Sequence, residues 1–172
     1  TDHGISVRSD LPGVGQNLQD HLFTFVVYER TDEEGPAPTS NIGEGGGYLY
    51  VDENEPAPDL QFHFCPVYYM DHGFANPDGL GFSIGSTQVR PESVGSVELA
   101  SADPMDDPVI DPQYLSADPD LSVLREGIKK ARTIAQAEPF DDIRGEEIWP
   151  GEDVQTDAEI ENHIRETCHT VY

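Results

Sequence analysis

Positive charge is scarce in this sequence, which holds 9 lysines and arginines against 34 aspartates and glutamates, for a formal net charge of −25. Nucleic-acid binding needs a basic surface that neutralises phosphates, so this balance disfavours it. The acidic residues are spread along the whole chain, a pattern that resembles proteins of salt-accumulating halophiles, in which concentrated salt screens the mutual repulsion. The alternative interpretation is an acidic surface that binds a cationic partner.

Long apolar runs and cysteines are also scarce. No run of 18 apolar residues occurs, so we predict no membrane span. The start, Thr1 to Gly4, has no initiator Met and none of the features of a signal peptide, so we expect a piece of a longer protein or a processed product. The only cysteines, Cys65 and Cys168, do not make a disulfide scaffold, and we expect two reduced thiols in a cytoplasmic protein.

Nucleotide-binding and nucleophile motifs are absent. The glycine fingerprint G-x-G-x-x-G would hold a dinucleotide pyrophosphate at a helix N-terminus. Every G-x-G pair here lacks the third glycine, and the chain has neither a P-loop nor a G-x-S-x-G elbow. The third position is held by Leu18, Tyr48, Tyr50 or Ile84. The residues therefore predict no nucleotide-binding module within this chain.

The histidines offer only weak indications of chemistry. His63 and Cys65 share one face of a predicted strand, with His72 nearby, but structural zinc prefers four ligands in closer pairs, so we predict no metal site. Asp20 precedes His21, and this pair either orients a general base or anchors a loop; the spacing favours the anchor. His169 has no partner nearby in the sequence.

The elements that are present indicate one domain with an α+β fold, in which an antiparallel sheet is covered on one face by helices. Apolar and polar residues alternate over 60–64, and β-branched and aromatic residues fill 23–28. Apolar spacings of three and four predict helices over 119–137 and 157–166, the second with a capping box between Thr156 and Glu159. Further strands are expected over 48–51, 81–89 and 95–99, loops over 10–22, 30–47 and 70–80, and an extended segment over 101–113.

Three segments carry a resemblance to a known family. Asp10-Leu-Pro-Gly-Val-Gly-Gln-Asn-Leu-Gln-Asp-His21 closely resembles the segment that follows the second signature of the glucose–methanol–choline (GMC) oxidoreductases. Residues 90–112 resemble the next block of the family, although Val94 stands where its usual form has arginine. Thr167-Cys-His-Thr-Val-Tyr172 is similar to the lead-in to the family's His-Pro-x-Gly-Thr motif. The resemblance covers essentially the whole chain.

The resemblance implies a two-domain flavoenzyme that oxidises an alcohol or choline-type CH–OH group by passing hydride to FAD. Residues 1–172 would be part of the substrate-binding domain, with a flavin-proximal loop over 1–22, mostly strands over 23–100 and helices over 115–168. The FAD-binding Rossmann domain of the same protein would lie outside this chain, so we expect the isolated chain to be inactive and to bind no FAD. The alternative is a stand-alone binding module with the same fold and no redox chemistry.

The resemblance also assigns expected sites. The catalytic histidine would come just after Tyr172, so no catalytic residue falls within this chain. Asn17, Asp20 and His21 would support the flavin. The pocket for a small alcohol would include Gln61, His63 and Arg90. Choline-oxidising relatives place a histidine where Arg90 stands, so a positive charge there counts against a cationic substrate.

Overall fold

A computed structural model describes residues 3–36, 39–75 and 77–172, which form two antiparallel sheets and two α-helices. The helices are α1 (Asp118–Ala135) and α2 (Asp157–Thr167), and short 3-10 turns lie at Asp71–Gly73 and Glu138–Phe140. The strands are β1 (Gln16–Leu18), β2 (Leu22–Arg30), β3 (Gly45–Leu49), β4 (Leu60–Cys65), β5 (Gly81–Gln88), β6 (Gly95–Glu98), β7 (Val109–Asp111), β8 (Arg144–Trp149) and β9 (His169–Thr170).

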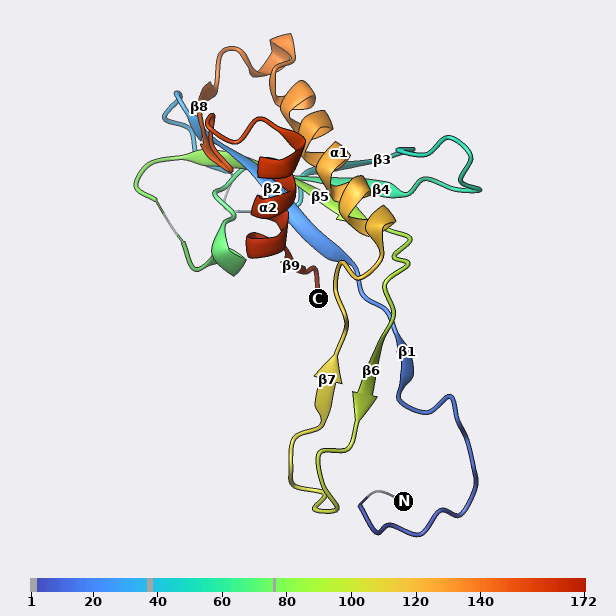
Figure 1. The fold of residues 1–172 in the computed structure, drawn as a ribbon. Coiled ribbons are helices and arrows are strands. Elements are labelled where there is room, and N and C mark those ends of the chain that lie inside the picture. The colour runs from blue at the N-terminus through green and yellow to red at the C-terminus, as the bar shows by residue number, and fades with distance from the viewer. Residues whose placement is uncertain (1–2, 37–38, 76) are drawn as a thin grey trace.

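The main sheet has the strand order β3-β4-β5-β2-β8, and β9 also pairs with β2. Both α-helices pack on the same face of this sheet, and neither covers the opposite face (Figure 1). This arrangement confirms the predicted α+β fold with helices on one face of an antiparallel sheet. None of the helices in the described part of the chain is long and apolar enough to cross a membrane.

The core lies between the helices and the sheet. Alternation along β2 sends Leu22, Val26 and Tyr28 toward the helices, and the predicted stripe of α1 meets them. Gly127 allows this close approach, because a Cβ there would lie 2.7 Å from the Cβ of Ser86. The stripe residues Leu121, Leu124, Ile128, Ala131 and Ala135 are all buried, as predicted.

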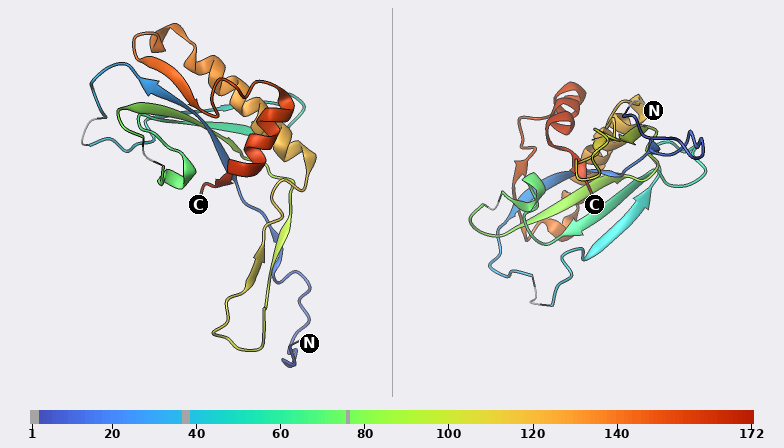
Figure 2. Two further views of the ribbon diagram at one scale, coloured as in Figure 1. Left: turned by 60° about the vertical axis from the view of Figure 1, so that its left-hand side comes forward. Right: turned by 90° about the horizontal axis from the view of Figure 1, so that it is seen from below.

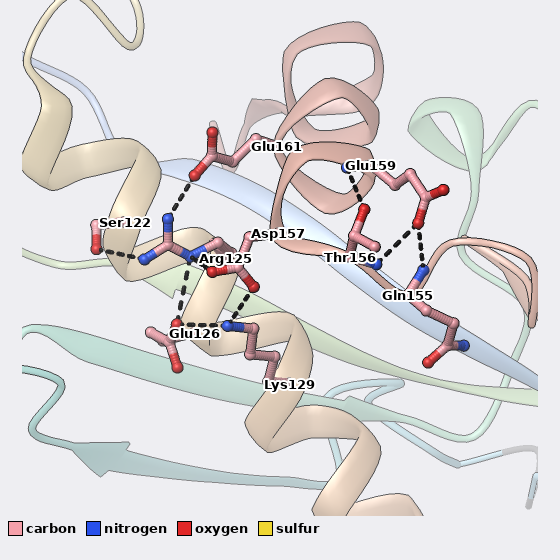
Figure 3. A network of polar contacts seen from close by, with 9 residues as sticks. All are labelled: Ser122, Arg125, Glu126, Lys129, Gln155, Thr156, Asp157, Glu159 and Glu161. Atoms are coloured by element: carbon pink, nitrogen blue, oxygen red, sulfur yellow. Dashed lines mark hydrogen bonds and ion pairs between the residues drawn. The ribbon is translucent and has the colours of Figure 1, made fainter.

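The contact between the two helices is partly polar (Figure 3). At the start of α2, the Thr156 hydroxyl accepts a hydrogen bond from the Glu159 N–H and the Glu159 carboxylate accepts one from the Thr156 N–H, which confirms the predicted capping box. On α1, Arg125 contacts Glu161, and Lys129 lies 2.7 Å from Asp157. Ion pairs therefore join the start of α2 to the middle of α1.

A second, three-stranded sheet of order β1-β6-β7 projects from the main body as an arm (Figures 1 and 2). It contains β1 and β7, which lie in segments predicted as a loop and as an extended stretch. Gly15 makes the arm possible, since its φ is 76° and a Cβ there would lie 2.2 Å from the Val97 carbonyl oxygen. Many apolar side chains of the arm are exposed, among them Val14, Leu99, Met105 and Ile110.

The sequence prediction was wrong for three strands of the main sheet. Gly45–Gly47, expected as part of a flexible loop, is paired with β4 at the sheet edge, where a Cβ on Gly46 would lie 2.8 Å from the Phe62 carbonyl oxygen. Strand β8 lies within 115–168, the region expected to be helical, and β9 follows that region, where no strand was expected. Their pairing with β2 is between distant segments, which local residue patterns do not report.

Candidate functional site

The face of the main sheet opposite α1 and α2 carries a distinct set of side chains. We call it the uncovered face because neither α-helix packs on it; residues 68–75 lie against its aromatic side chains instead. Strand alternation places Gln61, His63 and Cys65 there, so the prediction that His63 and Cys65 share a side is confirmed. From β5 this face receives Ser83, Gly85 and Thr87, and from β2 it receives Phe23, Phe25 and Val27.

Aromatic rings gather over the centre of the uncovered face. The rings of Phe23 and Phe25 lie 4.0 Å apart between centroids, and Tyr69 lies 4.5 Å from Phe25. His63 meets Phe23 edge-on at 5.2 Å. Ring contacts of this kind contribute about 0.5–1.5 kcal/mol each, so the uncovered face is a packed surface of rings with imidazole nitrogens among them.

His169 joins this ring cluster from β9. Its ring lies 4.0 Å from that of His72, and Phe25 and Tyr69 are also in contact with it. The Nδ1 atom of His169 lies 2.9 Å from the Thr170 carbonyl oxygen, and a carbonyl only accepts, so Nδ1 carries the proton. Burial, with the nearby His72 ring adding to it, lowers the pKa of His169 despite the opposing effect of this hydrogen bond.

The turn that carries His72 is strained. Asp71 and His72 have φ values of 46° and 55°, in the left-handed region that side chains rarely adopt. Each such residue costs on the order of 1–3 kcal/mol. The surrounding contacts, including the stacking of His72 on His169, hold the turn against this cost.

A cavity of about 520 Å³ opens beside β2, between the ends of β8 and β9. Strand β8 pairs with β2 as far as Val27, and β9 pairs at Phe23, so none of the described residues pairs with 24–26 along this edge. The chain's single tryptophan, Trp149, lines the cavity together with His72 and His169. The cavity therefore adjoins the ring cluster.

The loop before β2 binds the C-terminal segment. Asp20 accepts hydrogen bonds from the His21 N–H and from the Tyr114 hydroxyl, and the Val171 N–H donates to the His21 carbonyl at 3.1 Å. Burial pushes the pKa of Asp20 upward, but hydrogen bonds from Tyr114, Thr170 and His21 outweigh it, so the pKa is lowered. Burial and the bond to Asp20 raise the pKa of Tyr114 to about 12.

His21 also has a fixed orientation. Its Nδ1 lies 3.0 Å from the Gln88 carbonyl oxygen, so this nitrogen donates a proton, and its ring lies 6.0 Å from that of Tyr172. The predicted role of the Asp20–His21 pair as a loop anchor agrees with these contacts, because both residues bond to backbone groups or to Tyr114.

Arg90 lies in a different place from the other two predicted pocket residues. Its guanidinium pairs with Glu55 at 2.9 Å, in a cleft of about 840 Å³ that Asp20 and His21 also line. We call it the acidic cleft, because Asp52, Asp59 and Asp120 are among its lining residues. Asp59 and Asp120 in this cleft are buried, and their carboxylates accept backbone N–H groups of the adjoining loops. The carboxylates of Asp59 and Asp120 therefore stabilise the adjoining loops, and their oxygens already have hydrogen-bond partners within the fold.

The predicted site residues thus form two groups and one outlier. Gln61 and His63 lie together on the uncovered face, and Asp20, His21 and Arg90 line the acidic cleft. Asn17 lies on β1 of the arm, exposed and with a φ of 63°. Within the described residues no cluster of three or more His, Cys, Asp or Glu could hold a metal ion, and Cys65 and Cys168 are both free thiols.

The sequence did not reveal the ring cluster. His169 was interpreted as an isolated histidine, yet it is buried against His72, a residue 97 positions earlier in the chain. Tyr69 and Phe25 likewise meet only in the fold. Side chains alternate along a strand, so the sequence places Phe23 and Phe25 on the same face of β2 and assigns His63 to one face of β4. It does not indicate which residues of other segments pack on these faces.

Known proteins are similar to this chain over its whole length. Residues 91–172 match the family model described as GMC oxidoreductase. An alcohol dehydrogenase (acceptor) from Pseudomonas putida is 37% identical over 194 aligned residues, which cover 99% of this chain and 35% of that protein. The mitochondrial choline dehydrogenase of Homo sapiens is 35% identical, with 98% and 32% covered. The chain therefore spans about a third of the length of these curated relatives.

Solved structures share the fold. A pyridoxine 4-oxidase from Mesorbium loti superimposes with a TM-score of 0.85 at 26% identity, over 98% of this chain and 34% of that one. A formate oxidase of Aspergillus oryzae RIB40, whose study concerned modification of its FAD, gives a TM-score of 0.85 at 25% identity, over 99% and 38%.

Proposed function

Because this chain belongs to the GMC oxidoreductase family, we propose that it forms the substrate-binding portion of an FAD-dependent enzyme that oxidises an alcohol. The remainder of the relatives' length would supply the FAD-binding domain, as a further part of the same protein. In that reaction the CH–OH group would give up a hydride, which is two electrons and a proton, to the cofactor, and its hydroxyl proton to a base.

The observation that supports this function best is the uncovered face of the main sheet. An antiparallel sheet commonly exposes polar residues on the face away from its helices. Here that face carries aromatic rings and imidazoles in mutual contact, including Phe23, Phe25 and His63, and Tyr69 and Met70 pack on it. Such a surface suits one wall of a pocket that takes an apolar molecule with a single polar group.

The residues of this chain would form only one wall of a flavin-binding site. The rings of the uncovered face suit a flat heteroaromatic system, and the buried Nε2 of His63 has no partner among the described residues. The sequence holds no glycine fingerprint for the pyrophosphate, so that part of the cofactor would be bound by the other domain. When bound, FAD would supply the hydride acceptor.

The residues of the chain would divide the remaining work. Gln61 and His63 would orient the alcohol from the uncovered face. Asp20 and His21 would hold the C-terminal segment by the contacts already described, and so fix the path toward the histidine expected after Tyr172. A base must lie within hydrogen-bond reach of the hydroxyl, so the position of this segment matters for the reaction.

Anaerobic mixing with a primary alcohol tests this function on the purified natural polypeptide that contains the chain. We expect the polypeptide to carry flavin and its visible absorbance to bleach when the alcohol is added. A polypeptide without flavin, or a flavin that no alcohol reduces, would contradict the proposal and favour the stand-alone binding module.

A further inference from the structure

Two buried polar atoms on the uncovered face have no hydrogen-bond partner among the described residues: Nε2 of His63 and Oγ1 of Thr87. A buried polar group without a partner destabilises the fold, because it has lost its hydrogen bonds to water. Three other atoms share this state, but strand alternation places them on the helix side; they belong to Thr24, Ser86 and Gln88. The uncovered face thus holds a pair of unsatisfied groups in neighbouring strands.

The ring of Phe23 lies next to both His63 and Thr87. Phe23 is the direct strand partner of Thr87, and its ring meets the His63 ring edge-on at 5.2 Å between centroids. Residues opposite each other on one face of a sheet have Cβ atoms about 5 Å apart. Phe23 itself is only 8% exposed, so its ring covers this corner of the sheet and cannot bond to either polar atom.

Gly85 makes the covered position possible. It is the strand partner of both His63 and Phe25, and a Cβ there would lie 2.2 Å from the Phe23 ring. Its φ is not in the left-handed region, so the need for glycine at this position is one of space rather than of backbone conformation. Because Gly85 has no side chain, the Phe23 ring occupies the space that a Cβ would fill.

We propose that Phe23 is a movable cover over a polar subsite formed by His63 and Thr87, and that this subsite receives the hydroxyl end of the substrate. The inference rests on the proposed function for the identity of the ligand as an alcohol. A hydroxyl both donates and accepts, so it satisfies His63 in either tautomer, together with the Thr87 hydroxyl. Thr87 thereby becomes a specificity-determining residue that the sequence did not indicate.

The subsite would favour alcohols over hydrocarbons of the same shape. Displacing the ring of Phe23 uncovers two groups that an apolar ligand leaves unsatisfied, and a hydroxyl satisfies them. A site built to bond a hydroxyl rejects the analogue that lacks it. Charged groups are not needed for this discrimination.

The test uses the purified natural polypeptide that contains the chain, kept anaerobic, with ¹⁵N-labelled histidine and two probes, benzyl alcohol and toluene. We expect benzyl alcohol to move the ¹⁵N resonance of His63 Nε2, because that nitrogen gains a hydrogen bond, and toluene to leave it in place. Thr87→Val should weaken benzyl alcohol binding by about fivefold, the size of one neutral hydrogen bond. Thr87→Ser, which retains the hydroxyl, should restore it.

A second variant tests the cover itself and does not depend on Thr87. Phe23→Leu shortens the side chain, so water should reach His63 and shift the Nε2 resonance without any probe, while circular dichroism shows that the fold persists. Equal responses to the two probes, or an Nε2 resonance that Phe23→Leu leaves unchanged, would overturn the inference. Neither measurement reads flavin reduction, so failure here is distinct from failure of the proposed redox function.

Discussion

At the scale of single residues, Asp20 links the loop before β2 to the rest of the chain. Its carboxylate accepts the Tyr114 hydroxyl and the His21 N–H, and the His21 carbonyl in turn accepts the Val171 N–H. Sequence reasoning identified the Asp20–His21 pair and favoured an anchoring role. It gave no hint of Tyr114, because that residue is 94 positions away.

Replacing this carboxylate should destabilise the chain in a pH-dependent way. The folded state lowers the pKa of Asp20, so its contribution is complete above the ordinary Asp value of about 3.9 and is lost as the pH falls through the folded-state value. Since Asp20 is only half-buried, we expect Asp20→Asn to cost about 1 kcal/mol at pH 7. Chemical denaturation at pH 7 and pH 3 measures this.

The matched control is Asp107→Asn, at an exposed position of the arm. It should change the free energy of unfolding little at either pH. An Asp20→Asn penalty that is the same at pH 3 as at pH 7 would show that the carboxylate charge plays no part in the anchor.

Glu147 is a second residue whose loss should be costly. Its side chain is 8% exposed, pairs with Arg132 at 2.7 Å and accepts the Tyr28 hydroxyl at 2.9 Å. Glu147→Ala leaves the guanidinium, itself 13% exposed, without its partner, so we expect a loss of about 3 kcal/mol. Urea denaturation measures it, and Glu146→Ala at the exposed neighbouring position should cost less than about 0.5 kcal/mol.

At the scale of elements, the two helices were predictable and three strands were not. The apolar stripe of α1 and the capping box of α2 are patterns of residues close together in the sequence. The sequence alone therefore predicts both helices. Strand β8 owes its place to partners on β2 and α1, and β3 contains glycines that sequence reasoning assigns to loops. These elements depend on long-range pairing, which the order of residues along the chain does not display.

The packing of α1 on β5 gives a prediction for Gly127. A Cβ there would lie 2.7 Å from the Ser86 Cβ and 3.1 Å from a methyl group of Leu60. The alanine gains about 1 kcal/mol in helix propensity, but overpacking costs about 1–3 kcal/mol. We therefore expect Gly127→Ala to lower the melting temperature, whereas Gly13→Ala, with no atom within 4 Å, should not. A stabilised Gly127→Ala variant would contradict this contact.

At the scale of the whole molecule, the net charge of −25 predicts that stability depends on salt. The ion pairs that join α1 to α2 weaken as salt screens them, yet an exposed pair is worth at most about 1 kcal/mol. Repulsion among 25 net negative charges acts throughout the chain and is relieved by the same screening. The repulsion should outweigh the lost pairs, which is the basis of our proposal that the protein is adapted to high salt.

The melting temperature should therefore climb strongly between low salt and molar KCl. Calorimetry measures this, and sucrose serves as a control, because it favours burial without screening charge. A melting temperature that stays flat with KCl, or that rises equally with sucrose, would argue against adaptation to high salt.

The central claim is that the uncovered face of the sheet meets the alcohol, and neighbouring residues of β4 test it most directly. His63 points to the uncovered face and Phe64 to the helices. The measurement is the rate of anaerobic flavin reduction by a primary alcohol in the flavin-containing natural polypeptide. We predict that His63→Leu slows reduction by about tenfold or more and that Phe64→Leu changes the stability while leaving this rate near that of the unaltered protein. Equal rates in the two variants would contradict the claim.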